Sequence, residues 1–342
     1  MARLRVWLVL LCLAAVACGT GASPPAAGQG AGQGAFPVTI EHKYGSTEVP
    51  EEPERVITVG RIEQDAVLAL GVVPVAATEW FGEYPGAIFP WAQDALGDAS
   101  APEVLQPSYS AGGLPFERIA ALRPDLILAL YSDITARDYD TLSRIAPTIA
   151  QPGEYPDLGI SWQELTRTVG VALGRTDQAK RLVAGVEARF AQARQDHPEF
   201  AGSTALNVYS AGDGTYQAYP PPDLGGRLLT DLGLSVPTEI AELAGGQPFV
   251  EISGEQLDLF DTDVLVWLVD NDAQREQIRA NPVYARLDVA TEGRDVFLNY
   301  ETDTLSAATS FQTVLSLPFL LDGLVPLLAA AIDGDPTTTT GL

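Results

Sequence analysis

The chain has 342 residues, more than one hydrophobic core usually organises, so we expect two lobes. Hydrophobic residues make up 46% and charged residues 19% of the sequence, as in an ordinary globular protein. The net charge of −25 comes from 45 acidic and 20 basic residues, and because such a surface repels phosphate backbones, nucleic acid is excluded as a partner.

The first 35 residues have the composition of an export signal followed by a linker. Arg3 and Arg5 precede an apolar run over 6–17 that is too short for a stable membrane anchor, so we predict a signal peptide over 1–17. Residues 18–35 are rich in Gly, Ala, Ser, Pro and Gln, which predicts a flexible linker. Cys12 would be removed with the signal, and a single remaining cysteine excludes a disulfide framework.

The remaining cysteine, Cys18, allows two interpretations. Ala15-Val16-Ala17 satisfies a small-x-small cleavage site, which would leave Cys18 as a plain terminal thiol. Alternatively, Cys18 is the lipidated residue of a bacterial lipoprotein, although Ala15 stands where such signals usually carry leucine. Its position at the cleavage point favours lipidation, so we predict an extracytoplasmic protein that is anchored to the cell membrane through this tether.

An N-terminal α/β lobe is predicted over 36–174. Its sequence alternates between short apolar runs typical of strands and amphipathic stretches typical of helices. Such alternation predicts a mostly parallel sheet. We expect strands at 38–42, 55–59, 72–77, 126–130 and 147–150, and helices at 62–70, 117–122, 135–145 and 162–173.

The longest helical pattern follows, at 176–195, with apolar residues on one face and Gly174 before it. A helix of about twenty residues is about 30 Å long, enough to join two lobes as a rigid spine. We therefore predict a connecting helix over 175–197, while an ordinary surface helix of one large domain remains the alternative.

A C-terminal α/β lobe is predicted over 198–332, and a disordered tail over 333–342. Ser253, followed three residues later by Gln256, has the spacing of a capping box and predicts a helix there. The closing helical segment should break at Pro318. We expect strands at 206–209, 264–268 and 296–298, and helices at 223–232, 253–260 and 305–332.

Two segments far apart in the chain share one pattern. Glu117 and Glu255 are each followed, eight residues later, by Asp125 and Asp263, and then by an apolar strand. This indicates two related lobes that each present an acidic residue at an equivalent place. The simpler interpretation is that each Glu merely complements a helix N-terminus, worth about 0.3–1 kcal/mol.

The residues that most enzymes need are scarce. The chain has only 2 His, at 42 and 197, no G-x-S-x-G elbow, and no phosphate-binding loop around Lys43 or Lys180. Paired carboxylates of the glycosidase type and carboxylate-only Ca²⁺ binding remain open, the latter without a loop signature. We expect no enzyme, no cofactor and no metal site formed by the protein.

Aromatic residues gather instead in loops and at strand ends. In open α/β sheets, ligands lie beyond the carboxyl ends of the strands, where Tyr131, Tyr300 and the cation Arg61 are expected. Singly, each aromatic is more often packing than ligand contact, and Trp267, inside its strand, is expected in the core. Together, the set fits a cleft for a large, partly flat ligand.

The chain resembles the solute-binding lipoproteins of ATP-driven (ABC) importers, in the subgroup for ferric siderophores, haem and cobalamin. The resemblance covers about 53–333, and its Leu-x-Pro-Asp-Leu-Ile unit is fairly specific to that group. It implies two Rossmann-like α/β lobes that are joined by a single long helix and open only slightly. It rests on Pro53-Glu-Arg-Val-Ile-Thr-Val, Ala69-Leu-Gly-Val-Val-Pro-Val, Glu117-Arg-Ile-Ala-Ala-Leu-Arg-Pro-Asp-Leu-Ile-Leu, the 162–174 segment, the spine helix and Thr304-Leu-Ser-Ala.

The resemblance also implies partners and roles. A Glu on each lobe of such receptors docks against Arg residues of the permease, and Glu117 and Glu255 match those positions. The implied function is capture of a ferric siderophore, iron acquisition by delivery to the permease, and action as a monomer. The implied ligand-binding residues are Arg61, Trp80, Tyr84, Tyr109, Tyr131, Tyr216, Phe249 and Tyr300.

One departure bears on the ligand. Catecholate receptors usually present several cationic side chains, whereas here Arg61 is the clear candidate and Arg137 and Arg227 are uncertain. A neutral or weakly charged siderophore therefore fits better. Haem with a Tyr axial ligand, cobalamin, and a surface scaffold or sensor that no longer transports remain the alternatives.

Overall fold

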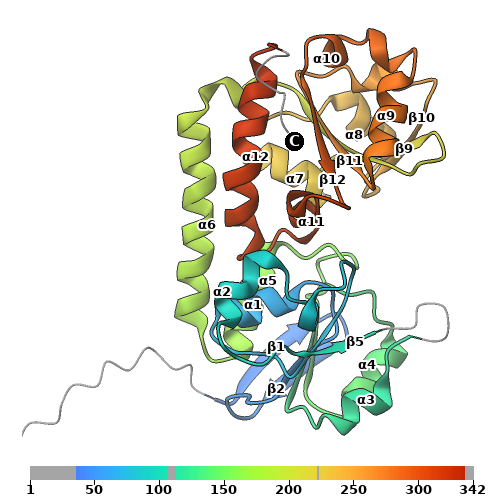
Figure 1. Ribbon diagram of the computed structural model, residues 1–342. Coiled ribbons are helices and arrows are strands. Elements are labelled where there is room, and N and C mark those ends of the chain that lie inside the picture. The colour runs from blue at the N-terminus through green and yellow to red at the C-terminus, as the bar shows by residue number, and fades with distance from the viewer. Residues whose placement is uncertain (1–35, 107–112, 222, 336–342) are drawn as a thin grey trace, which may run out of the picture. The chain divides into compact units, whose positions relative to one another are not determined.

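The structure is a computed structural model that describes residues 36–106, 113–221 and 223–335 (Figure 1). The predicted signal peptide, the linker with Cys18, the candidate Tyr109 and most of the predicted C-terminal tail lie outside the described residues.

The first lobe is built on a five-stranded sheet in which every pair of neighbours is parallel. Its strand at Leu126–Ala129 is a continuous apolar run because both faces of the sheet are buried there. In spatial order the strands are β5 (Glu103–Leu105), β4 (Ala76–Thr78), β3 (Val56–Thr58), β6 (Leu126–Ala129) and β7 (Thr148–Ala150).

Short helices connect these strands, and a separate antiparallel hairpin precedes them. The expected first strand is confirmed as one half of that hairpin, whose second strand the sequence did not suggest. The hairpin strands are β1 (Val38–His42) and β2 (Gly45–Val49), and the helices are α1 (Glu63–Ala69), α2 (Gln93–Leu96), α3 (Phe116–Ala121), α4 (Ala136–Leu142) and α5 (Trp162–Ala172).

The strands of the second lobe lie in the same spatial order, but one of them runs opposite to the others. β8, β11 and β12 are parallel, whereas β9 runs antiparallel to both of its neighbours, β8 and the edge strand β10. The prediction of a mostly parallel sheet is confirmed for the first lobe, whereas the second sheet is mixed. In spatial order the strands are β10 (Val250–Ser253), β9 (Thr215–Ala218), β8 (Ala205–Ser210), β11 (Val264–Val269) and β12 (Asp295–Asn299).

Helix α6 (Thr176–Asp196) follows the first sheet in the chain and precedes the second. Its 21 residues bury one apolar face, including Val183 and Phe190. Figure 1 shows α6 running beside α12 (Ser316–Ile332), which it contacts. The predicted long connecting helix is confirmed. The remaining helices are α7 (Leu224–Asp231), α8 (Thr238–Ala244), α9 (Asp272–Ala280), α10 (Asp288–Thr291) and α11 (Thr304–Phe311).

Asp125 and Asp263, the acidic residues of the repeated pattern, make equivalent hydrogen bonds in the two lobes. Asp125 accepts hydrogen bonds from the backbone N–H groups of Glu54 and Arg55, at 2.9 and 2.8 Å. Asp263 accepts from the N–H and the hydroxyl of Thr204, at 2.7 and 2.8 Å. Each carboxylate thus joins the entry of one strand to the entry of its parallel neighbour, so the pattern reports equivalent positions in two related lobes.

Two predictions about helix limits are wrong. The expected helix over 253–260 is instead the end of β10, a turn, and a 3₁₀ helix at Leu257–Phe260, because Ser253 pairs with Thr215 in the sheet. The Ser253 hydroxyl meets the side chain of Gln256, 3.2 Å away. The closing segment does break into two helices, but at 312–315, between α11 and α12, and not at Pro318. Pro318 lies in the first turn of α12, where a missing N–H costs nothing.

Candidate functional site

Two loops of the first lobe meet beyond the carboxyl ends of β3 and β6. The backbone N–H of Arg61 donates to the carbonyl of Tyr131, at 3.1 Å. The backbone N–H of Tyr131 in turn donates to the buried carboxylate of Glu63, at 2.7 Å. Arg61 and Tyr131, both predicted to bind the ligand, are therefore held side by side where an α/β sheet places its ligand.

The side chain of Arg61 faces an aromatic ring. Its guanidinium carbon lies 5.6 Å from the centre of the Trp80 ring, within the range of a cation–π contact. A guanidinium nitrogen also lies 3.4 Å from the carboxylate of Asp133. The charge of Arg61 is thus already partly balanced within its own lobe.

Aromatic rings from both lobes form one continuous cluster, which we call the inter-lobe aromatic cluster. Phe81 lies 5.9 Å from Tyr300, and Trp80 lies 5.5 Å from Phe311 and 6.3 Å from Tyr131, all between ring centres. The cluster therefore joins the loop that follows β4 to residues from the second lobe. Its members are Trp80, Phe81, Tyr84, Phe89, Trp91, Tyr131, Tyr300 and Phe311.

The second lobe adds two tyrosines that were not among the predicted binding residues. Tyr209, whose ring centre is 6.4 Å from that of Tyr300, donates to Asp270 at 3.1 Å. Burial and the charge of Asp270 raise the pKa of Tyr209 to about 12. Burial and the charges of Asp223, Tyr300 and Tyr209 raise the pKa of Tyr219 as well, which places these groups together. The sequence signal that could have identified Tyr209 and Tyr219 is their position at the ends of strands β8 and β9.

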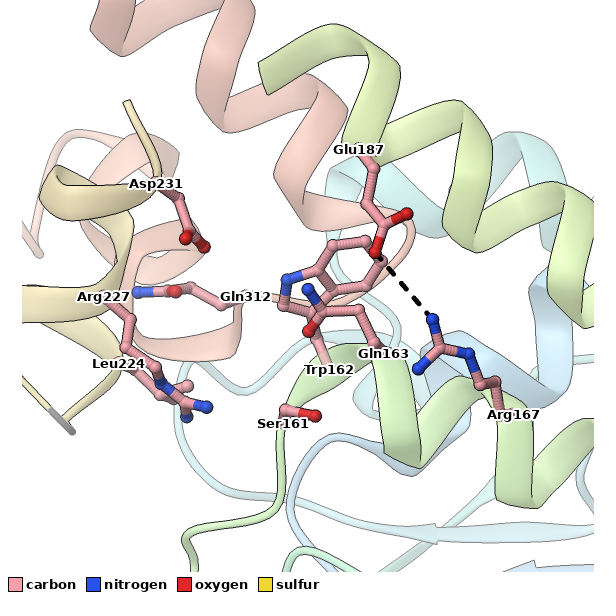
Figure 2. A pocket seen from close by; sticks show the side chains of 9 residues that line it. All are labelled: Ser161, Trp162, Gln163, Arg167, Glu187, Leu224, Arg227, Asp231 and Gln312. Atoms are coloured by element: carbon pink, nitrogen blue, oxygen red, sulfur yellow. Dashed lines mark ion pairs between the residues drawn. The ribbon is translucent and has the colours of Figure 1, made fainter. Parts of the chain in front are cut away.

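The cation Arg227 lies close to this region. Burial and the charge of Asp223 raise the pKa of Tyr131, and the charges of Arg61 and Arg227 oppose that rise. Arg227 also lines a cavity of about 340 Å³ bounded by α5, α6 and α7. In Figure 2, Arg227 and Asp231 of α7 lie across this cavity from the ion pair between Arg167 and Glu187. Arg137 is exposed in the first turn of α4, and no contact joins it to the cluster among the described residues.

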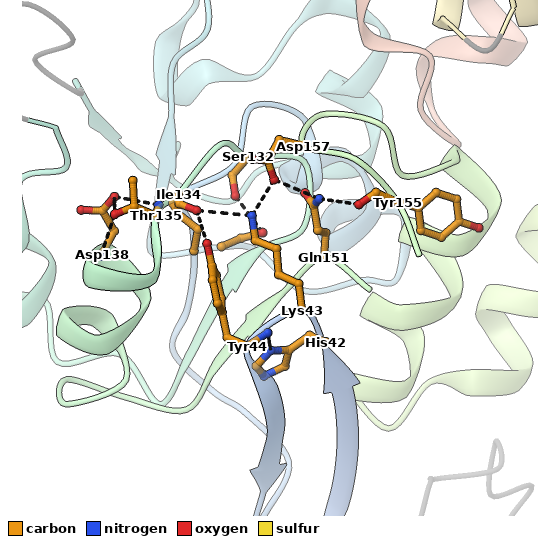
Figure 3. A network of polar contacts seen from close by, with 11 residues as sticks. His42, Lys43, Tyr44, Ser132, Ile134, Thr135, Asp138, Gln151, Tyr155 and Asp157 are labelled. Carbon is orange, nitrogen blue, oxygen red and sulfur yellow. Dashed lines mark hydrogen bonds and ion pairs between the residues drawn. The ribbon is translucent and has the colours of Figure 1, made fainter. Parts of the chain in front are cut away.

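The loop after β6 is also fixed from the N-terminal hairpin (Figure 3). The Lys43 ammonium donates to the carbonyl of Ile134 at 3.3 Å and pairs with Asp157 at 2.5 Å. The Tyr44 hydroxyl donates to the same carbonyl of Ile134. Lys43 therefore ties together the loops that follow β6 and β7, and the first of these carries Tyr131.

Not every predicted binding residue joins the cluster. Tyr216 is 4% exposed and packs edge-to-face against Trp267 and Phe260 in the core of the second lobe, so it is corrected to a core residue. Phe249 is 37% exposed and lies 6.1 Å from Tyr219, at the edge of the region. The prediction that Trp267 is core is confirmed by its complete burial.

The two predicted docking residues are on the surface. Glu117 lies in the first turn of α3, and Glu255 lies in the turn before the 3₁₀ helix of the second lobe. Both are exposed, and neither carboxylate forms an ion pair or a hydrogen bond with another described residue.

Two further features concern only the described part of the chain. None of its helices combines the length and the apolar character of a membrane span. Within the same residues, His, Cys, Asp and Glu side chains do not assemble into a group of three that could hold a metal ion.

Comparison with known proteins places this fold among solute receptors. Residues 76–299 match a family model described as periplasmic binding protein. A crystal structure of a periplasmic solute-binding protein from Mycobacterium smegmatis is 36% identical, covers 86% of this chain and 99% of its own, and has a TM-score of 0.76.

Two more relatives have named ligands. The structure of PiaA from Streptococcus pneumoniae in complex with ferrichrome is 28% identical, covers 87% of this chain and 99% of its own, and has a TM-score of 0.74. A Bacillus subtilis protein named "Probable siderophore-binding lipoprotein YfiY" is 26% identical over 70% of this chain and 72% of its own length.

Proposed function

The chain belongs to the periplasmic binding protein family, whose members are solute receptors and not enzymes, and we propose that it captures a ferric siderophore outside the cell membrane and delivers it to an importer permease. The observation that carries the proposal is the inter-lobe aromatic cluster, because it joins rings from both lobes beside Arg61 at the carboxyl ends of the strands. Relatives named as siderophore-binding, one of them solved with ferrichrome, support it.

The ligand contacts proposed here combine predicted residues with residues that the fold adds. Large, rigid rings bury much apolar area and lose little conformational freedom on binding, and the arginines supply cations to a ligand rich in oxygen atoms. Tyr109 stays a prediction because it lies outside the described residues. The proposed contacts are Arg61, Trp80, Tyr84, Tyr131, Tyr209, Tyr219, Arg227, Phe249 and Tyr300.

The charges in this region favour a neutral or weakly charged complex. Arg61 already pairs with Asp133, and Arg227 lies near Asp223 and Asp231. A strongly anionic catecholate complex would meet these carboxylates without a surplus of cations. In a ferric trihydroxamate, three anionic groups cancel the charge of Fe(III), so that class of siderophore is the best match.

Ferric hydroxamates are therefore expected to quench the tryptophan fluorescence of the protein in a saturable titration. A panel of ferrichrome, ferric enterobactin, ferric citrate, haem and cobalamin ranks the ligand classes directly. Saturation with haem or cobalamin alone would replace the siderophore by that ligand. No response to any of the five would overturn the proposed function.

Replacing Trp80 by alanine should weaken binding of the preferred ligand about tenfold, because a lost ring contact costs about 1–2 kcal/mol. Tyr216→Phe is the matched control, since the Tyr216 ring lies in the core of the second lobe and should leave the dissociation constant unchanged. Equal effects of the two substitutions would contradict this placement of the site.

We also propose that Cys18 carries the lipid that anchors the receptor. Cys18→Ala should move the protein from the membrane fraction to the soluble extracytoplasmic fraction, because a lipid anchor is lost while the folded part is unchanged. Mass spectrometry of the mature N-terminus checks the modification directly. An unmodified Cys18 in the wild-type protein would contradict the proposal.

Delivery requires a partner, and we propose that Glu117 and Glu255 dock on the permease, one from each lobe. Exposed carboxylates can form bidentate pairs with arginine forks, which give both charge complementarity and orientation. The alternative, a scaffold or sensor that no longer transports, predicts that these residues are dispensable.

A further inference from the structure

A buried carboxylate lies directly behind the proposed ligand site. Glu63, the first residue of α1, is completely buried. One of its oxygens accepts the backbone N–H of Tyr131 at 2.7 Å, and the other accepts the backbone N–H of Ile62 at 3.2 Å. A single carboxylate thus holds the loop after β3 and the loop after β6.

The absence of a side chain at Gly60 leaves the space that the Glu63 carboxyl group fills. A Cβ atom added to Gly60 would lie 1.9 Å from the nearer oxygen of Glu63, so any larger residue at position 60 would displace the Glu63 carboxyl group from this place. The same pair of loops is joined once more by the bond from the Arg61 N–H to the Tyr131 carbonyl. An apolar side chain in place of Glu63 would leave two inward-pointing N–H groups without an acceptor.

We propose that Glu63 is a positioning residue of the ligand site, which fixes Arg61 and Tyr131 relative to one another. This inference rests on the proposed function, because it takes Arg61 and Tyr131 as ligand contacts. The carboxylate touches no ligand itself. It acts by binding the loop after β3 and the loop after β6 to one another.

The chain contains a matched control for this role. Asp125 joins the entries of β3 and β6 by accepting the N–H groups of Glu54 and Arg55, whereas Glu63 joins the two loops that leave those strands. Glu63→Gln and Asp125→Asn each replace a carboxylate oxygen by an amide donor that faces a backbone N–H. The two variants therefore disturb the same pair of strands, but at opposite ends.

The first measurement needs no ligand. Because the amide of Gln has one acceptor oxygen, hydrogen exchange followed by mass spectrometry should show faster exchange of the Tyr131 or the Ile62 amide in Glu63→Gln than in the wild type, with the strand 126–129 unchanged. In Asp125→Asn the Tyr131 amide should exchange as in the wild type. Unchanged exchange at both Tyr131 and Ile62 in Glu63→Gln would overturn the inference.

The second measurement uses ferrichrome as the probe. Glu63→Gln should weaken its binding about tenfold or more, and Asp125→Asn should not. In a double-mutant cycle, Arg61→Ala should cost less affinity in the Glu63→Gln background than in the wild type, because the two residues act as a unit. Additive losses, or equal losses in both carboxylate variants, would contradict the positioning role.

The two proposals can fail separately. A wild-type protein that binds no ferric siderophore refutes the proposed function, whereas the exchange experiment still decides whether Glu63 fixes the loops. If Glu63→Gln does not fold, Glu63→Asp serves in its place. It keeps the carboxyl group but is one methylene too short to reach both loops, so the same changes in exchange and affinity are expected.

Discussion

Replacing Glu117 and Glu255 together by alanine is expected to abolish uptake of the ligand while leaving its affinity for the receptor unchanged. Both carboxylates are exposed and make no ion pair or hydrogen bond with another described residue, so removing them leaves no group of the receptor unpaired. At an interface with arginine, loss of a desolvated charge pair costs about 2–5 kcal/mol for each partner. Two such losses would lower the affinity of the receptor for the permease so far that uptake stops.

Cells that express the variant receptor with its permease should therefore fail to accumulate labelled ferric siderophore, whereas purified receptor still quenches normally. Asp94→Ala with Glu239→Ala is the matched control, because each is an exposed acidic residue in the first turn of a helix, one in each lobe. The substitutions of Asp94, Glu117 and Glu239, which lie in the first turn of a helix, should each cost the fold only about 0.3–1 kcal/mol. Normal uptake by the Glu117/Glu255 variant, or equal loss in the control, would remove the docking role.

The second large effect concerns Asp65, which is completely buried where the two lobes meet. One of its oxygens accepts the indole N–H of Trp91, at 2.8 Å, and the hydroxyl of Thr313, which precedes α12. The other oxygen has no hydrogen-bond partner among the described residues. Burial raises the pKa of Asp65 from 3.8 to about 6, against the lowering effect of these two hydrogen bonds.

The raised pKa means that the folded state binds the proton of Asp65 more tightly than the unfolded state. Its contribution to stability is complete below the unfolded value near 4, and is lost as the pH rises through about 6. A difference of about two pKa units corresponds to about 3 kcal/mol of unfolding free energy. This part of the stability should therefore fall between about pH 4 and pH 7.

Asp65→Asn tests this directly. The amide oxygen can keep both hydrogen bonds, while the ionisation is removed, so the variant should gain about 3 kcal/mol relative to the wild type between about pH 4 and pH 7. Urea unfolding across that range measures it, and the difference between the two proteins isolates Asp65 from other buried acids such as Glu63. Parallel stability curves would contradict the assignment.

Much of the fold could be predicted because its signals are local. Continuous apolar runs, such as Leu126–Ala129 and Val264–Val269, mark buried strands, and the spacing of Val183, Val186 and Phe190 marks the inner face of the long helix. The repeated Glu-to-Asp spacing indicated two related lobes before either was seen. Where the prediction was wrong, at 253–260, a helix-capping pattern competed with the antiparallel pairing of β10 with β9, and pairing prevailed.

The sequence by itself determined two α/β lobes, a long helix between them, and a loop rich in aromatic residues. Only the tertiary structure decided which aromatic rings are in contact. Tyr216 packs into the core of the second lobe, whereas Phe311 belongs to the inter-lobe aromatic cluster. It also revealed Glu63 and Asp65, whose partners Tyr131 and Thr313 lie 68 and 248 residues away. Periodicity records which face of an element is buried, but a buried carboxylate finds its partners only through long-range packing, and these partners have no signature in the local sequence.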